Sequence, residues 1–366
     1  MKYKEQLQNL LKTAGLREGR DYLVKNEKLY ARVFSSGSLG LGEAYMDGWW
    51  DAPRLDDFFD KLLSSGIDKT AKKNPSLIMA VLWSKILNPQ SKRRAFKIAK
   101  AHYDIGNDLF ERMLDKRLTY TCGYWKDGKT LDEAQEAKLD LICQKLKLKS
   151  GMKVLDIGSG WGSFLNYASK KYGVKAVGVT VSKEQVELAK KMSKGLDVET
   201  KLADYRNISG KYDRVVSVGM IEHVGSKNYK TFMKTVDRVL KDDGIFLLHT
   251  IGKNTSTPYI DPWIAKYIFP NSSLPSIKQL AKAMEGLFVM EDWHNFGVYY
   301  DKTLMAWYEN FKNSWNEIKD NYDERFYRMW EYYLLSCAGS FRSRRNQLWQ
   351  IVLTKNGLRG GYQSIR

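Results

Sequence analysis

The pattern of apolar and polar positions from about residue 131 onward predicts strands that alternate with helices. Residues 131–148 carry apolar side chains at helical spacing, and an apolar strand sequence follows them. Strands are predicted at 153–157, 176–179, 198–202, 214–218, 244–249 and 347–353, and further helices at 163–172, 183–194 and 227–240. This alternation is typical of an α/β fold with a parallel, doubly wound sheet of the Rossmann-like type.

The sequence outside this alternation predicts additional units. Residues 1–68 are expected to form a small N-terminal domain, with Trp49 and Trp50 in its core and with turns at the glycines of SSGSLGLGEAYMDGWWD (35–51). Residues 253–335 predict an aromatic, mostly helical insertion, whose aromatic side chains either pack in the core or line an acyl pocket. The expected domains are 1–68, a basic linker at 69–100, and a catalytic domain at 101–366 that contains the insertion.

The composition is that of a folded protein. The chain has 366 residues, of which 43% are hydrophobic, enough for about two domains of ordinary size. Runs of ~18 apolar residues are absent, and the N-terminus has no apolar signal core, so we expect neither a membrane span nor a signal peptide. Cys122, Cys143 and Cys337 form no CxxC pair, which fits a reducing cytoplasm and predicts no metal site.

The charge balance predicts an anionic partner. Lys and Arg total 60 against 42 Asp and Glu, a formal charge of +18, which suits either nucleic acid or a phospholipid surface. Residues 69–103 hold nine Lys or Arg and no acid among apolar side chains. This pattern fits a basic amphipathic segment on an anionic lipid surface and an ordinary linker helix equally well. Residues 332–366, with six Lys or Arg and no acid, are a second candidate for contact with phosphate headgroups.

The strongest local motif is VLDIGSGWG, residues 154–162. Its glycines follow a predicted strand and open a helix, where they allow a tight turn and the close approach of a ligand. A dehydrogenase would carry an acidic residue at the end of the second strand, and Thr180 stands there instead, which disfavours NAD. With Asp156 at the strand end, the GxGxG spacing resembles motif I of S-adenosylmethionine-dependent methyltransferases.

Polar side chains after the next strands are candidates for contact with the rest of that cofactor. Thr180 and Gln185 could bond its ribose or methionine part, while Ser182 caps the following helix. Asp204 could accept from the adenine amino group and Tyr205 could lie against the base, unless this segment is a solvated loop. The full candidate set for the cofactor is Tyr103, Tyr120, Thr121, Asp156, Gly158, Gly160, Gly162, Thr180, Ser182, Gln185, Asp204, Tyr205 and Arg206.

Several longer segments resemble the cyclopropane-fatty-acid synthase family, which is related to the mycolic acid cyclopropane synthases. Together with VLDIGSGWG they are LGLGEAYMDGWWD (39–51), HYDIGNDLF (102–110), LTYTCGYW (118–125), VGMIEHVG (218–225), FLLHTIG (246–252), DPWIAKYIFPNSSLPS (261–276), YYDKTLMAWYENF (299–311) and FRSRRNQLWQ (341–350). These segments span nearly the whole chain in family order. Ser159 is one departure, since the family often has Cys there. A ligand at this turn contacts its backbone, so we expect the chemistry to be unchanged.

The resemblance implies a class I methyltransferase fold and methylene transfer from S-adenosylmethionine to a cis double bond of unsaturated acyl chains in membrane phospholipids. An alkene is a weak nucleophile, so the enzyme must align it with the sulfonium methyl and keep water from the resulting cation. A base must then remove a proton to close the ring. The resemblance assigns this role to bicarbonate and implies that its cradle is Cys122, Glu222, His249, the backbone of Ile251, and Tyr300, with Cys337 as a thiol that lines the pocket.

Each of these side chains also has a structural interpretation: Cys122 as a small buried hydrophobe, His249 as a satisfied strand-end histidine, and Tyr300 as core. The resemblance implies a cytoplasmic enzyme at the inner face of the membrane and leaves a homodimer open.

Alternatives are a methyltransferase of a lipid or small molecule without ring closure and a lipid-binding protein with a vestigial cofactor turn. A nucleic-acid partner is disfavoured, because no DPPY-type sequence follows the fourth strand and no Pro-Cys pair occurs.

Overall fold

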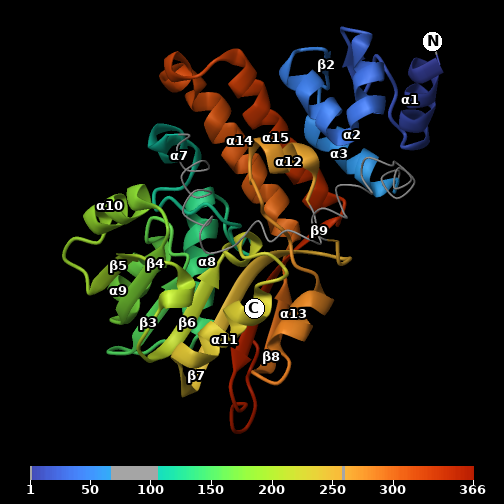
Figure 1. The fold of residues 1–366 in the computed structure, drawn as a ribbon. Coiled ribbons are helices and arrows are strands. Elements are labelled where there is room, and N and C mark those ends of the chain that lie inside the picture. The colour runs from blue at the N-terminus through green and yellow to red at the C-terminus, as the bar shows by residue number, and fades with distance from the viewer. Residues whose placement is uncertain (1, 67–105, 258–259) are drawn as a thin grey trace. The chain divides into compact units, whose positions relative to one another are not determined.

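The computed structural model describes residues 2–66, 106–257 and 260–366 (Figure 1). Its contacts divide the chain into two compact units, and each is described by itself. The helical unit comprises Met1–Leu87, Thr257–Pro270 and Tyr300–Asn346, and the sheet unit comprises Asn88–Ser256, Asn271–Tyr299 and Gln347–Arg366. This grouping differs from the linear division predicted from the sequence, since two parts of the 253–335 stretch group with the N-terminal helices. The boundaries expected at residues 68 and 100 lie outside the described residues.

The sheet unit is built on a seven-stranded sheet in the order β5-β4-β3-β6-β7-β9-β8. Its strands are β3 (Lys153–Ile157), β4 (Lys175–Thr180), β5 (Val198–Leu202), β6 (Tyr212–Val218), β7 (Leu240–Lys253), β8 (Val289–Asn295) and β9 (Asn346–Thr354). The strands from β5 to β7 pair in parallel, and β8 pairs antiparallel with β9. The predicted α/β fold with a mostly parallel sheet is confirmed.

Helices cover both faces of this sheet (Figure 1). They are α8 (Leu131–Lys145), α9 (Ser163–Tyr172), α10 (Lys183–Met192), α11 (Tyr229–Val239) and α13 (Ile277–Met284), and the sheet unit also contains α7 (Asn107–Met113). Successive strand residues point to opposite faces: Val154 packs in the core of α8 and α9, and Leu155 packs in the core of α11 and α13. Buried strands with two apolar faces are what a sheet covered on both sides requires.

The order of the strands reverses between β3 and β6. From β3 the chain moves outward to β4 and β5, and it then returns to β6 on the other side of β3. In open α/β sheets, ligands bind outside the carboxyl ends of the strands at such a reversal. The segments that follow β3 and β6, namely 158–162 and 219–225, are therefore placed at the expected ligand site.

Two strands depart from the predicted ranges. β7 begins at Leu240, before the predicted start at 244, and it continues to Lys253. β8 lies inside the stretch for which mostly helical structure was predicted. Its first two residues, Val289 and Met290, are exposed, so an edge strand with one neighbour shows no clear alternation in its sequence.

The helical unit contains α1 (Lys2–Thr13), α2 (Lys28–Met46), α3 (Leu55–Ser64), α12 (Pro262–Tyr267), α14 (Val298–Ile318) and α15 (Glu324–Arg342), with the short pair β1 (Leu23–Val24) and β2 (Trp50–Asp51). The α15 helix packs against α2 and α3. Glu331 of α15 accepts hydrogen bonds from the hydroxyls of Tyr45 (2.6 Å) and Tyr308 (2.7 Å). Trp50 is buried as predicted, with its ring against Tyr45 and Phe58.

The prediction that the glycines of 35–51 mark turns is wrong for two of them. Gly40 and Gly42 lie inside α2. A Cβ atom at Gly40 would lie 2.4 Å from the carbonyl oxygen of Arg32, and one at Gly42 would lie 2.4 Å from Cδ1 of Trp263. These glycines permit close packing of the helix rather than a change of chain direction. Gly37, with φ of +57°, does kink the helix.

Candidate functional site

The glycine-rich turn follows β3 directly. Gly158, Gly160 and Gly162 have φ values of +88°, +52° and +86°, in the region that favours glycine. The carbonyl of Val179 accepts hydrogen bonds from the amides of Gly158 (2.9 Å) and Ser159 (3.1 Å), which ties the turn to β4. Gly162 is the N-cap residue of α9, so the turn presents the start of a helix at the carboxyl edge of the sheet.

Asp156 lies at the end of β3, beneath this turn. Its carboxyl group is 3% exposed, and its Oδ1 atom has no hydrogen-bond partner. Burial raises the pKa of Asp156 to about 7. A buried oxygen without a hydrogen-bond partner lowers the stability of the fold. Because Asp156 Oδ1 lies next to the turn, it is a candidate for contact with a ligand.

The predicted residues after β4 form one cluster. Thr180 Oγ1 donates to Gln185 Oε1 (2.6 Å), and Ser182 Oγ accepts from the amide of Gln185 (3.2 Å). Ser182 is thus the N-cap of α10, the structural role weighed for it from the sequence. All three side chains are buried at the carboxyl end of β4, beside the glycine-rich turn.

The residues after β5 are held by one another and by the core. Asp204 is 2% exposed, accepts from the amide of Arg206 (2.9 Å), and forms an ion pair with its guanidinium group (3.1 Å). The ring of Tyr205 packs edge-on against Phe232 of α11, with a centroid distance of 5.4 Å, and the guanidinium group of Arg206 lies over it. The segment is therefore an ordered part of the sheet unit and not a solvated loop.

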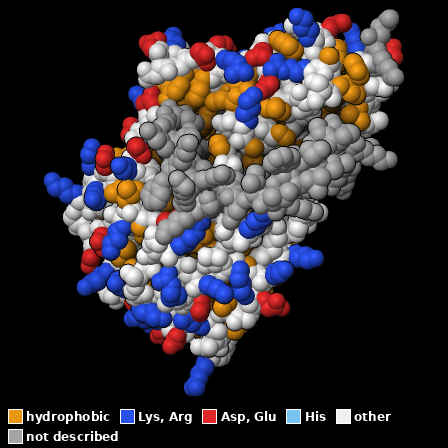
Figure 2. Space-filling model, viewed as in Figure 1, with side chains coloured by type: hydrophobic (Ala, Val, Ile, Leu, Met, Phe, Trp, Pro, Cys, Tyr) orange, Lys and Arg blue, Asp and Glu red, His pale blue; other side chains and the backbone are white. Residues whose placement is uncertain are grey.

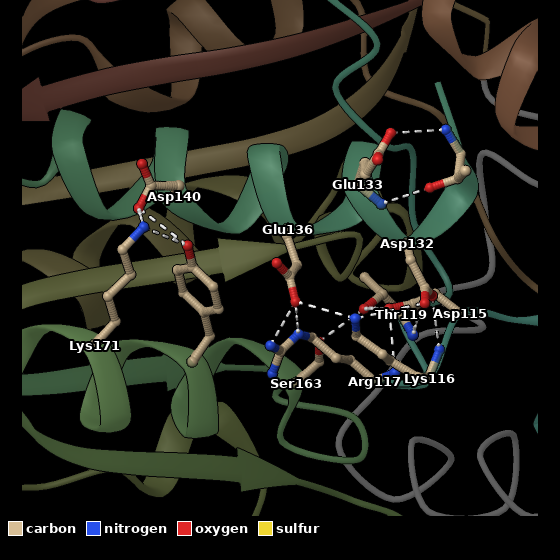
Figure 3. A network of polar contacts seen from close by, with 12 residues as sticks. Asp115, Lys116, Arg117, Thr119, Asp132, Glu133, Glu136, Asp140, Ser163 and Lys171 are labelled. Atoms are coloured by element: carbon tan, nitrogen blue, oxygen red, sulfur yellow. Dashed lines mark hydrogen bonds and ion pairs between the residues drawn. The ribbon is translucent and has the colours of Figure 1, made fainter. Parts of the chain in front are cut away.

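A polar network holds the segment before Tyr120 against α8 and α9 (Figure 3). Asp115 Oδ1 accepts from the amide of Thr119 (2.7 Å), and the hydroxyls of Thr119 and Ser163 share a hydrogen bond of 2.7 Å. Arg117 forms an ion pair with Glu136 of α8 (2.7 Å). Because Ser163 is the first residue of α9, this network also ties the segment to the helix that follows the glycine-rich turn.

The loop that follows carries Thr121 and Cys122, and it lies on α8. The side-chain amide of Gln135 donates to the carbonyl of Thr121 (2.7 Å), and the thiol of Cys122, which is fully buried, donates to the carbonyl of Gly123 (3.2 Å). A Cβ atom at Gly219 would lie 2.8 Å from Cγ2 of Thr121, so the loop contacts the residue that follows β6.

Glu222 lies in a short 3₁₀ helix, Ile221–His223, after β6. Its Oε1 atom accepts from the amide of Ile251 (2.8 Å), whereas its Oε2 atom is buried without a partner. Burial raises the pKa of Glu222 to about 7. A Cβ atom at Gly158 would lie 2.5 Å from Cγ of Met220, so the segment that carries Glu222 contacts the glycine-rich turn.

His249 lies on β7 and is 1% exposed. Its carbonyl accepts from the amide of Gly219 (2.9 Å), which joins it to the end of β6. The side-chain amide of Gln350 faces His249 Nδ1 at 3.3 Å. Nε2 is buried without a partner, and burial keeps the pKa of His249 well below its usual range. The side chain is therefore a neutral imidazole with one buried ring nitrogen, Nε2, that has no partner in the protein.

The structure thus gathers Thr121, Cys122, Glu222 and His249 of the predicted set at the carboxyl ends of β3, β6 and β7. Ile251 positions Glu222 through its amide. Two other predicted residues belong to the helical unit. Tyr300 stacks on Phe341 there, with a centroid distance of 4.4 Å, and burial raises the pKa of Cys337 to about 12, which makes its thiol a poor nucleophile. Tyr103 lies outside the described residues.

Three side chains of this site were not predicted. Gln350 orients His249, and Gln135 and Lys138 of α8 bond the loop that holds Cys122. Each has a sequence signal: Gln350 interrupts a predicted apolar strand, and the two α8 residues fall between apolar helical positions such as Ala134 and Leu141. Across the described ranges, groups of three or more His, Cys, Asp or Glu side chains that could hold a metal ion are absent.

Comparisons with known proteins identify the family. A family model described as mycolic acid cyclopropane synthetase matches residues 90–351. Cyclopropane-fatty-acyl-phospholipid synthase of Escherichia coli (strain K12) is 55% identical over 93% of this chain and 90% of its own length. A probable fatty acid methyltransferase of Pseudomonas putida is 30% identical over 91% of this chain and 86% of its own length.

A solved structure agrees with these sequences. The crystal structure of mycolic acid cyclopropane synthase CmaA1 complexed with SAH and CTAB is 33% identical, with a TM-score of 0.65 over 71% of this chain and 98% of that one. Such a methyltransferase needs this fold and the glycine-rich turn after β3. It also needs polar side chains beside that turn, and Thr121, Cys122, Glu222 and His249, the carboxyl-edge cluster, lie there. The chain belongs to the mycolic acid cyclopropane synthetase family, and it is an S-adenosylmethionine-dependent enzyme of lipid cyclopropanation.

Proposed function

We propose that this enzyme transfers a methylene group from S-adenosylmethionine to the cis double bond of an unsaturated acyl chain in a membrane phospholipid, with bound bicarbonate as the proton acceptor. The observation that carries the proposal is the pair of buried polar atoms without partners, Glu222 Oε2 and His249 Nε2, next to the glycine-rich turn. Because buried polar atoms nearly always have partners, we expect a small polar ligand to reach both. The name of the Escherichia coli relative supports the class of substrate.

The residues around the turn fit S-adenosylmethionine. When bound, this molecule supplies a methyl group on a sulfonium centre. The side of Gly160 is open, with no atom within 4 Å of a Cβ position, so backbone can approach a ligand there. Asp156, Asp204 and the cluster of Thr180 and Gln185 supply acceptors and donors along the carboxyl edge of the sheet.

Two glycine variants test this placement. Gly160→Ala adds a methyl group in open space, so we expect a loss of only about 1 kcal/mol in the free energy of unfolding, from the left-handed backbone. The same methyl group would stand where the cofactor approaches, so S-adenosylmethionine should bind at least tenfold more weakly in isothermal titration. Gly158→Ala places its Cβ 2.5 Å from Met220 Cγ and should cost more stability than Gly160→Ala. Unchanged cofactor affinity in Gly160→Ala would argue against contact at this turn.

The carboxyl-edge cluster also fits bicarbonate, which would supply a proton acceptor. The anion needs donors, and a neutral His249 with its proton on Nε2 would supply one. It also needs a partner that does not repel it, and a carboxyl group with a pKa of about 7 holds a proton for a large fraction of the time near neutrality. Cys122, Glu222, His249 and the backbone of Ile251 would hold the anion in the sheet unit, and the family resemblance adds Tyr300.

The reaction is tested with labelled S-adenosylmethionine and vesicles of a mono-unsaturated phospholipid, followed by mass analysis of the released fatty acids. Ring closure adds one CH₂ and removes the alkene, and we expect this product together with S-adenosylhomocysteine. Omission of bicarbonate from carbon-dioxide-free buffer should slow its formation. Label that stays entirely in S-adenosylmethionine would contradict the proposal.

A second function is favoured by one relative. The Pseudomonas putida protein is named a probable fatty acid methyltransferase, and a cation that loses a different proton would give a methyl-branched alkene. The two products have the same mass, so the released fatty acids are first hydrogenated under mild conditions: a methyl-branched alkene adds hydrogen and gains two mass units, and a cyclopropane does not. A branched product would replace the first proposal with this one.

We also propose that the enzyme works from the cytoplasm at the inner membrane face. The described helices include none long and apolar enough to cross a membrane. On the face drawn in Figure 2, Lys and Arg side chains are spread among acidic ones and do not gather in one patch. The candidates for lipid contact are the basic stretch 69–103, which lies outside the described residues, and residues 332–366.

Charge reversal within that stretch tests the membrane proposal. The triple change Lys92→Glu, Arg93→Glu and Arg94→Glu replaces three positive charges by negative ones, and each basic residue near an anionic surface contributes about 1 kcal/mol. We expect at least a tenfold loss of binding to anionic vesicles in a low-salt flotation assay, with unchanged affinity for S-adenosylmethionine. Equal flotation of both proteins would remove this segment from the lipid interface.

A further inference from the structure

Lys138 is a lysine in the interior of the sheet unit. It lies on α8, is 1% exposed, and donates from Nζ to the hydroxyl of Thr121 (3.0 Å). No Asp or Glu of the described residues lies within ion-pair distance of its ammonium group. Lys145, two turns further along the same helix, is also buried but has Asp292 at 3.7 Å. Since a buried lysine is rarely left without a counter-ion, the buried charge of Lys138 suggests a functional role.

The ionisable groups that act on Lys138 form no ion pair with it among the described residues. Asp115, Cys122 and Asp156 are the groups that act on it electrostatically. Burial raises the pKa of Asp156 to about 7, so this carboxyl group holds a proton for much of the time near neutral pH, and burial also raises the pKa of Asp115. Burial lowers the pKa of Lys138 only to about 8, so the amine stays mostly protonated at neutral pH. The result is a buried positive charge at the carboxyl edge of the sheet.

This charge is directed at the site of Glu222 and His249. Thr121, the acceptor for Lys138, packs its methyl group toward Gly219, and the amide of Gly219 donates to the carbonyl of His249. The positive charge of Lys138 is also one of the causes that keep His249 neutral. One lysine therefore contacts the loop of Thr121 and Cys122 and also contributes to the electrostatic potential at the histidine.

We propose that Lys138 is a positioning residue for the reaction: it fixes the Thr121–Cys122 loop against the ends of β6 and β7 and supplies the buried positive charge that makes the neighbouring site prefer an anion. This inference rests on the proposed function, in which that anion is bicarbonate. Without Lys138 the cluster of Cys122, Glu222 and neutral His249 carries no positive charge to offset the anion. A buried anion is stable only where such a charge compensates it.

The two ligands of the site have opposite charges, and this separates the role of Lys138 from mere support of the fold. A positive charge favours bicarbonate and opposes the sulfonium group of S-adenosylmethionine. Loss of the charge should therefore weaken bicarbonate binding and leave the cofactor at least as tightly bound. A collapse of the loop would weaken both ligands.

The experiment uses the full chain and three variants. Lys138→Met removes the charge and the donor, and Lys138→Gln removes the charge but keeps a donor for Thr121. Gln135→Leu is the matched control, because it removes another α8 side chain that bonds the same loop, at the carbonyl of Thr121, without changing charge. Sodium bicarbonate is titrated in carbon-dioxide-free buffer against matched sodium chloride, with the thermal unfolding midpoint and isothermal titration as readouts. S-adenosylmethionine affinity is measured separately, without lipid.

For both Lys138 variants we expect bicarbonate affinity to fall at least tenfold, S-adenosylmethionine affinity to stay within threefold, and the apparent KM for bicarbonate in turnover to rise. Gln135→Leu keeps the charge of Lys138, so it should lower bicarbonate affinity less than either Lys138 variant does. If Lys138→Met does not fold, Lys138→Gln carries the test. Full bicarbonate affinity in Lys138→Gln, or parallel losses of both ligands, would overturn the inference.

The same data distinguish a failure of this inference from a failure of the proposed function. If the unsubstituted protein forms cyclopropane and binds bicarbonate, but the variants bind it equally well, only the role of Lys138 is wrong. If the unsubstituted protein binds no bicarbonate, the proposed proton acceptor is wrong, and so is the proposed role of Lys138.

Discussion

Glu222→Gln should lower the turnover of unsaturated phospholipid by about 10²–10⁴-fold, the range for loss of a group that handles a proton. The substitution keeps the Oε1 atom that accepts from the amide of Ile251, so the local fold should persist. It replaces Oε2, the buried atom without a partner, by an amide group that neither releases nor takes up a proton. The measurement is the initial rate of cyclopropane formation, with S-adenosylmethionine affinity by titration as a second readout.

The affinity for S-adenosylmethionine should stay within about twofold, because Glu222 follows β6 and bonds Ile251 of β7, whereas the cluster after β4 is held by bonds of its own. Glu291→Gln is the matched control. The Glu291 carboxylate also accepts from a backbone amide, that of Leu358 (2.8 Å), and from the hydroxyl of Thr354 (2.7 Å), but it belongs to β8 at the sheet edge. That variant should turn over normally. A fully active Glu222→Gln would remove this carboxyl group from the mechanism.

The sequence predicted the part of the site that depends on strand ends. An apolar strand followed by GxGxG can be recognised locally, and so can GMIEHVG after the fourth strand, because parallel strands bring their carboxyl ends to one edge. The structure places Asp156, Glu222 and His249 at that edge. What brings them together is the strand order, with β3 and β6 as neighbours although they lie far apart in sequence.

The rest depends on contacts that local patterns do not carry. Gly40 and Gly42 are typical turn residues by composition, yet their roles are set by Arg32 and Trp263, which approach them only in the folded chain. Lys138 falls between apolar helix positions, where a lysine is usually expected to reach solvent. Its burial follows from the loop of Thr121, which closes over that helix face.

A second consequence of the buried carboxyl group concerns stability. Glu222 has a pKa of about 7 in the folded protein against an ordinary value of 4.5. The folded form therefore binds this proton more tightly than the unfolded form, so the free energy of unfolding falls as pH rises from about 4.5 and levels off above about 7. The shift corresponds to about 3 kcal/mol lost over that window, of which about 2 kcal/mol falls between about pH 5 and pH 8.

Glu222→Gln removes this titration, because a glutamine stays neutral at every pH. The variant should match the unsubstituted protein most closely near pH 4.5, where both side chains are neutral, and should be more stable by about 2–3 kcal/mol near pH 8. Urea unfolding at a series of pH values measures the difference, and the titration of Asp156 cancels because both proteins share it. Parallel curves would mean that Glu222 is ionised without cost in the folded state. A variant that is inactive yet more stable in alkaline solution would show that the fold bears the cost of this buried acid for the sake of the reaction.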